Sequence, residues 1–192
     1  MSYLFKIFLG DNLYYSQLFL FLEGDDDERF FKYILVEKFK QLYTDVKIWK
    51  YSRKTDIQRK RFIDTINNVE NWFYFCFRDF DSAICITSKK EIISYKYDRI
   101  DEEKIFIIIG EIESWYLAGV DNDFLRSIGS TNLMERPSIY TTKEEFNNLI
   151  PKKMPRILFM RKILQNYDIR LALRNNSSLK YLFGKLFYSE IN

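Results

Sequence analysis

The 192-residue sequence has no histidine and only two cysteines, six glycines and three prolines. Without histidine the chain cannot form a Ser-His-Asp type of catalytic triad, and two cysteines cannot fill a closed tetrahedral zinc site. Any catalytic metal would therefore be held by oxygen ligands, which favours magnesium (Mg²⁺) or manganese (Mn²⁺). The scarcity of glycine and proline leaves little room for disordered linkers.

The sequence also lacks long apolar runs and a disulfide framework. Cys76 and Cys85 are expected to be reduced, buried thiols in a cytoplasmic protein. No stretch reaches the roughly 18 to 20 uninterrupted apolar residues that a membrane span needs. The apolar start has no small-residue cleavage site and is interrupted at Asp11-Asn12, so it does not read as a signal peptide. We expect a soluble chain with no membrane partner.

Hydrophobic residues are abundant, at 47% of the sequence, and include 18 Phe and 14 Tyr. This content is ample for one folded domain, and the aromatic surplus makes a homodimer reasonable. Charge is uneven along the chain: residues 143–192 carry ten Lys or Arg and four Asp or Glu, a net of +6, so residues 1–142 carry −3. An acidic part joined to a basic part fits a metal site beside a surface for a polyanion; a solvated helical face is the alternative.

Short apolar runs alternate with helical patterns. Strands are expected at Leu18–Leu22, Trp72–Phe77 and Ile105–Ile109, which are apolar on both faces, and at the more exposed Asp45–Ser52. The helical patterns between them are Asp26–Leu42 and Asp56–Val69, and Ser88–Tyr95 is a short helix or a loop. The order β-α-β-α-β-α-β predicts an α/β fold whose sheet is mainly parallel and four-stranded, with helices on both faces.

The C-terminal part has a helical pattern. Residues 1–120 are expected to form the α/β domain, and residues 121–192 a basic helical extension packed on it. Helices are expected at Ile112–Ala118, Ile157–Leu164, Ile169–Leu173 and Leu179–Phe187, and the segment from Ser127 to Phe146 reads as a loop that enters a helix. Tyr3–Leu9 fits either an edge strand or a helix.

Acidic residues follow the three apolar strands. They are Glu23 and Asp27 after the first, Asp79 and Asp81 after the third, and Glu111 and Glu113 after the fourth. The carboxyl ends of parallel strands meet at one edge of the sheet, where α/β proteins bind ligands. Clustered like charges repel, and a divalent cation with oxygen ligands removes that cost. In an extended segment Asp79 and Asp81 would point the same way.

Glu23-Gly24-x-x-Asp27 after one strand, with Asp79-x-Asp81 after a later one, resembles the Toprim domain over about residues 16–120. That catalytic domain is shared by type IA and type II topoisomerases, bacterial primases, OLD-family nucleases and small ribosomal-RNA maturases. The resemblance implies that Glu23 is a general acid/base or metal ligand and that Asp79 and Asp81 bind magnesium. It also implies that Asp27 is a further acid of the site.

By the same resemblance, Glu111, with Glu113 less closely matched, corresponds to an acid that binds a second ion in nuclease members. Ser82-Ala83 stands where the family has a glycine after the Asp-x-Asp pair. Asp25, Asp26 and Glu28 are better explained as acids at a helix N-terminus than as ligands.

Carboxylates with magnesium are suited to phosphoryl transfer. The chain is too short for the strand-passage apparatus of a topoisomerase and lacks the zinc module of a primase, so hydrolysis of nucleic acid, DNA or RNA, is the expected activity. Five basic residues are candidate nucleic-acid contacts: Lys152, Lys153, Arg156, Arg161 and Lys162. A non-catalytic Toprim-like module that binds nucleic acid or a partner protein, and a phosphohydrolase of small phosphate esters, are the alternatives. Whether an ATPase partner is needed stays open.

Overall fold

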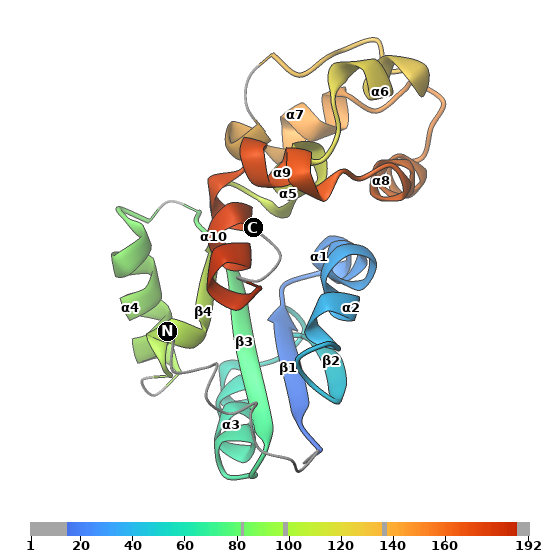
Figure 1. Cartoon of the computed structure of the whole chain (residues 1–192). Coiled ribbons are helices and arrows are strands. Elements are labelled where there is room, and N and C mark those ends of the chain that lie inside the picture. The colour runs from blue at the N-terminus through green and yellow to red at the C-terminus, as the bar shows by residue number, and fades with distance from the viewer. Residues whose placement is uncertain (1–14, 82, 98–99, 136–137, 188–192) are drawn as a thin grey trace.

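The computed structural model describes residues 15–81, 83–97, 100–135 and 138–187. Its one sheet has four strands: β1 (Gln17–Leu22), β2 (Asp45–Lys50), β3 (Trp72–Asp79) and β4 (Ile105–Ile108). Their order in space is β2-β1-β3-β4, and every neighbouring pair is parallel (Figure 1). The predicted α/β fold with a parallel four-stranded sheet is confirmed.

Helices cover both faces of this sheet. The segments between the strands are α1 (Asp25–Phe30), the π-helix η2 (Phe31–Leu35), α2 (Val36–Phe39), α3 (Asp56–Asn67), α4 (Ile86–Lys96) and the 3-10 helix η3 (Glu102–Lys104). Side chains alternate across β1, so that Leu18, Leu20 and Leu22 pack with α1 and α2, whereas Phe19 and Phe21 pack on the face of α3 and α4. Burial on both faces explains why β1 is continuously apolar.

The C-terminal part is helical, as predicted. It contains α5 (Ile112–Ala118), α6 (Asn122–Ser127), η4 (Ser138–Tyr140), α7 (Lys143–Asn148), α8 (Arg156–Gln165), α9 (Ile169–Asn175) and α10 (Ser177–Leu186). Figure 1 shows α5 to α9 beyond the carboxyl ends of the strands, while α10 returns against the sheet. The acid-bearing strand ends therefore face the group formed by α5 to α9.

Helix α5 joins these two parts of the molecule. All seven of its residues are buried, and the Trp115 ring packs against Phe30 and Phe31 at centroid distances of 5.6 and 6.1 Å. The Trp115 indole N–H donates to Ser178 Oγ at 2.8 Å, which ties α5 to α10. Because only three residues separate the end of β4 from the start of α5, this packing also fixes the acids at its first turn.

Several sequence predictions need correction. The helix expected over Asp26–Leu42 ends at Phe39 and contains the π segment. The wider turn of the π segment brings Phe31, Leu35 and Phe39 together in the core. Helix α6 was not predicted; its signal is the N-cap Asp121, whose side chain accepts from Phe124 N at 2.8 Å.

Both cysteines are free thiols, but only Cys76 is buried. Cys85 is exposed because it caps α4 and its Sγ accepts from Ser88 N, so the expectation that it is buried is wrong. The segment Tyr3–Leu9 lies outside the described residues, and the domain boundary at residue 120 stays a prediction. Among the helices of the described ranges, none combines the length and apolarity needed to cross a membrane.

Candidate functional site

Two carboxylates meet where the strand order of the sheet reverses direction. The chain steps from β1 outward to β2 and then returns past β1 to β3, so the ends of β1 and β3 form the switch point at which α/β sheets bind ligands. Glu23 directly follows β1, and Asp79 is the last residue of β3. Phe21 of β1 pairs with Cys76 of β3, so the two strands run side by side toward this edge. The prediction that these strand ends are parallel neighbours is confirmed.

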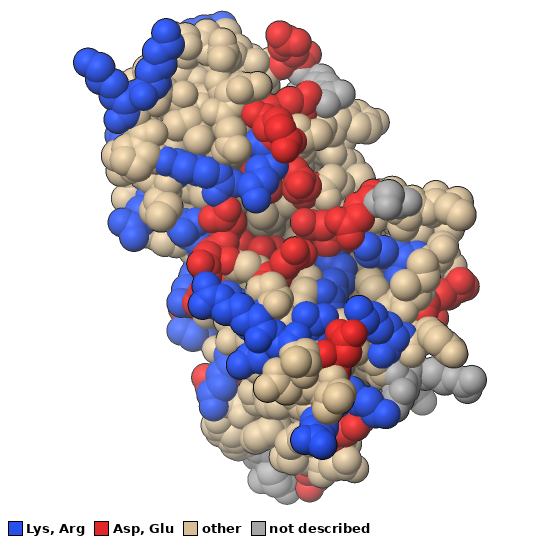
Figure 2. Space-filling view, turned by 180° about the vertical axis from the view of Figure 1, so that it is seen from behind, with Lys and Arg blue, Asp and Glu red and all other residues tan. Residues whose placement is uncertain are grey.

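A cleft of about 390 Å³ opens at this edge. It is lined by Glu23, Gly24, Asp25, Asp26, Asp27, Asp79, Glu111, Ile112, Glu113 and Lys143. Figure 2 shows acidic side chains gathered in a hollow across the middle of the molecule, between the sheet and the helical group. Of the six acids predicted from the sequence, five therefore line one cleft.

Asp27 and Asp79 are two members of this group whose pKa values are raised well above the usual range of a carboxyl group. Burial first, and the Glu23 charge to a lesser degree, raise the pKa of Asp27 to about 7 although its Oδ2 accepts the Gly24 N–H at 3.0 Å. Burial, followed by the charges of Asp27 and Glu23, raises the pKa of Asp79 to about 8. In the part of the chain that the structure describes, no side chain donates to the Asp79 carboxylate. A cation in the cleft would stabilise the ionised form of both carboxyl groups and so lower their pKa values.

The Glu23 carboxylate accepts a hydrogen bond from the side chain of Tyr51. Tyr51, in the turn after β2, donates from Oη to Glu23 Oε2 at 3.3 Å and lies 3.4 Å from the Phe77 carbonyl oxygen. The guanidinium of Arg78 lies 3.3 Å from the Tyr51 ring centre, and this cation–π contact also holds the Tyr51 ring in place. Tyr51 was not predicted from the sequence; its position directly after β2 was the available signal.

The acids on α5 have different environments. Glu111 is the N-cap residue of α5, and its Oε2 accepts the backbone N–H of Lys143. Glu113 is buried, and it pairs with Arg156 Nη2 at 2.6 Å. Burial raises the pKa of Glu113, and the nearby Arg156 charge opposes this rise. Glu113 therefore serves to join α5 to α8, whereas Glu111 faces the cleft mouth.

The expectation that Asp79 and Asp81 point the same way is wrong. Strand β3 ends at Asp79, and Asp81 has a φ of 48°, so the segment is not extended. The Asp81 side chain is 68% exposed, and its Oδ2 lies 2.6 Å from Lys89 Nζ on α4. Asp81 is not among the described residues that line the cleft.

The five predicted basic contacts do not form one continuous group. Arg156 pairs with two acids that line the cleft, Glu113 and Asp26 on α1, but it is not itself among the described lining residues. Lys152 and Lys153 are exposed in the turn before α8. On α8 itself Arg161 is exposed and Lys162 is partly buried. A sixth basic residue, Lys143, lines the cleft and was not predicted.

The donors fit a hydrated magnesium ion better than a fully protein-ligated one. Among the described residues, no three Asp, Glu or Cys side chains are arranged as a ready-made metal site. Magnesium commonly binds through one or two carboxylates and completes its shell with water and substrate phosphate. The unpartnered Asp79 carboxylate beside Glu23 meets that requirement with oxygen donors alone.

Comparisons of the chain with protein-family models, with curated proteins and with solved structures found no match. The structure establishes an α/β fold with a four-stranded parallel sheet. The resemblance to the Toprim domain therefore rests on the residues at the strand ends and on this topology.

Proposed function

We propose that the protein is a magnesium-dependent nuclease of the Toprim type, which hydrolyses phosphodiester bonds in nucleic acid. One observation carries this proposal: Glu23 and Asp79 stand at the carboxyl ends of adjacent parallel strands and line the same cleft. Carboxylates at a switch point, with raised pKa values at Asp27 and Asp79, are the arrangement expected of a site for a divalent cation and a phosphate.

Glu23 and Asp79 are the residues that would hold the ion, with Asp27 beside them and Glu111, which also lines the cleft, for a second ion. Bound magnesium neutralises phosphate charge and lowers the pKa of water. Manganese, which also takes oxygen ligands, would substitute. We do not propose Asp81 as a ligand, because its carboxylate pairs with Lys89 and is not among the described groups that line the cleft.

The remaining roles belong to the chain itself. Tyr51 holds the Glu23 carboxylate toward the cleft, so that Glu23 can accept or return a proton at the scissile phosphate. Lys143 supplies a cation at the cleft wall for charge that develops on the phosphate oxygens. Positioning, by Tyr51, and charge neutralisation, by Lys143, are the main demands of phosphoryl transfer.

The test is a cleavage assay on single- and double-stranded DNA and RNA, with magnesium, manganese or a chelator. Glu23→Gln and Asp79→Asn are each expected to reduce metal-dependent cleavage by about a hundredfold or more. Asp123→Asn is the matched control, because Asp123 is exposed on α6 and, among the described residues, pairs with Arg126 alone. Cleavage that persists in both cleft variants would contradict the proposal.

A non-catalytic module that binds nucleic acid or a partner protein is the second candidate. The lack of a ready-made group of three acidic ligands among the described residues favours it. It predicts salt-sensitive binding of nucleic acid without turnover under every metal condition. Hydrolysis of nucleotides but not of polynucleotides in the same assay would instead indicate a phosphohydrolase of small phosphate esters.

A further inference from the structure

Basic side chains border the acidic cleft on the side of the sheet. Lys50 is the last residue of β2, and the turn between β2 and α3 carries Arg53 and Lys54. Lys50 Nζ lies 2.6 Å from Asp25 Oδ1, and Arg53 Nη2 lies 3.9 Å from Asp25 Oδ2. Because Asp25 lines the cleft, this turn forms one of its edges.

A second basic group borders the cleft on the side of the helices. Lys143 is itself a lining residue, and Arg156 pairs with Asp26, another lining residue. Lys152 and Lys153 lie in the turn that leads into α8, four and three residues before Arg156. The start of α7 and the start of α8 therefore border the cleft on this side, and the turn with Lys152 and Lys153 leads into α8; these basic residues are together called the opposite edge.

The first turn of α1 separates the two edges. Consecutive residues of a helix project about 100° apart, so Asp25 and Asp26 face different neighbours. Asp25 faces the β2–α3 turn and Asp26 faces α8. Figure 2 shows basic side chains on both sides of the acidic hollow, in agreement with these contacts.

Most of these cations are not neutralised within the protein. In the described ranges of the chain, the side chains of Lys54, Lys143, Lys152 and Lys153 pair with no carboxylate. Arg53 is 77% exposed and its single acidic contact is long. Uncompensated cations on both edges of a cleft attract a ligand that carries several negative charges.

We propose that the protein binds a nucleic-acid strand across the cleft, with phosphates contacting Arg53 and Lys54 on one edge and Lys143, Lys152 and Lys153 on the other. This rests on the proposed function, since it passes the strand over Glu23 and Asp79. A ligand contacts both edges only if it carries several phosphates, so the substrate class is a polynucleotide and not a mononucleotide. The β2–α3 turn is a binding element that the basic C-terminal sequence does not reveal.

The proposal is tested by fluorescence anisotropy with labelled oligonucleotides, DNA and RNA, single- and double-stranded. Every protein carries Asp79→Asn, so that binding is measured in magnesium without cleavage, and circular dichroism verifies folding. One edge is neutralised by Arg53→Gln with Lys54→Gln. The other edge is neutralised by changing Lys143, Lys152 and Lys153 to Gln.

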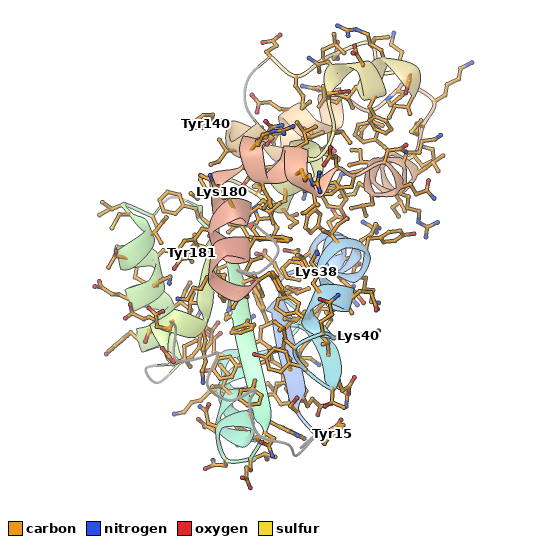
Figure 3. All side chains as sticks on the ribbon, viewed as in Figure 1. Tyr15, Lys38, Lys40, Tyr140, Lys180 and Tyr181 are labelled. Atoms are coloured by element: carbon orange, nitrogen blue, oxygen red, sulfur yellow. The ribbon has the colours of Figure 1, made fainter. Side chains whose placement is uncertain are left out.

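The matched control is Lys40→Gln with Lys180→Gln. Both lysines are exposed. Figure 3 labels Lys40 beside α2 and Lys180 on α10, on the face of the molecule opposite to that of Figure 2. Each edge variant is expected to weaken binding by about 5- to 30-fold and to lower the salt dependence by roughly 0.7 to 0.9 per removed charge. The control is expected to change affinity by less than about twofold.

Affinity is also expected to rise with oligonucleotide length until both edges are contacted, over roughly 4 to 16 nucleotides. Equal losses in the control and the edge variants, or affinity independent of length, would overturn the proposal. Binding at both edges by a protein that never cleaves would retain this inference and remove the nuclease function. Cleavage by wild type together with unchanged binding in both edge variants would remove this inference and retain the nuclease function.

Discussion

Removing the negative charge of Asp79 is expected to stabilise the metal-free protein. Asp79 is half-buried at the end of β3 and has no donor among the described side chains. Burial and the charges of Asp27 and Glu23 raise its pKa from 3.8 to about 8. The ionised carboxylate is therefore less favourable in the folded protein than in the unfolded chain.

The sign of the pH dependence follows from proton binding. Between about pH 4 and pH 8 the folded state binds more protons at Asp79 than the unfolded state does, so the free energy of unfolding falls as pH rises. Each pKa unit corresponds to about 1.4 kcal/mol, which sets an upper limit of ~5 kcal/mol at pH 8. Relaxation of a half-buried site reduces this several-fold, and we expect about 2 kcal/mol.

Thermal unfolding followed by circular dichroism measures this effect. In chelator at about pH 8, Asp79→Asn is expected to melt about 4 to 8 °C above wild type, with a smaller difference at pH 5. Excess magnesium is expected to raise the Tm of wild type and to shrink the gap, because an ion that binds only the folded state stabilises it. The exposed-site control Asp123→Asn is expected to melt with wild type at both pH values. An Asp79→Asn protein that melts at or below wild type in chelator at pH 8 would refute the reasoning.

Three further predictions follow from single contacts. Tyr51→Phe keeps the ring but removes the hydroxyl that donates to Glu23, so cleavage is expected to fall about tenfold in kcat with little change in folding, as steady-state kinetics and circular dichroism would show. Gly110→Ala is expected to destabilise the protein in urea titrations by about 2 kcal/mol, because φ is 78° and an added Cβ would lie 3.0 Å from a backbone oxygen; Gly129→Ala, with φ 89° and open space, is expected to cost about half as much. Arg156→Gln leaves the buried Glu113 carboxylate without its counter-ion and is expected to cost about 2 kcal/mol at pH 7, with a smaller cost as the pH falls, because burial raises the pKa of Glu113 and the protonated carboxyl needs no counter-ion. An unchanged kcat, equal losses at both glycines, or a pH-independent cost would contradict these respective expectations.

The sequence by itself determined the sheet and the acids at its carboxyl edge. Strands buried on both faces must be apolar at consecutive positions, so β1, β3 and β4 are visible as short runs of Phe, Leu and Ile. Parallel pairing then requires residues such as Glu23 and Asp79, which follow such runs, to share one edge. These features depend on local hydrophobicity and chain order, which the sequence carries directly.

Only the tertiary structure decided how the charges pair. The turn after β3 gives Asp81 a positive φ and directs its carboxylate to Lys89, which no spacing rule reveals. Arg156 meets Asp26 across 130 residues of sequence, and Lys143 reaches the cleft because α5 packs the helical group over the strand ends. Such contacts depend on where packing brings distant segments together, and the side chains that form them carry no local pattern.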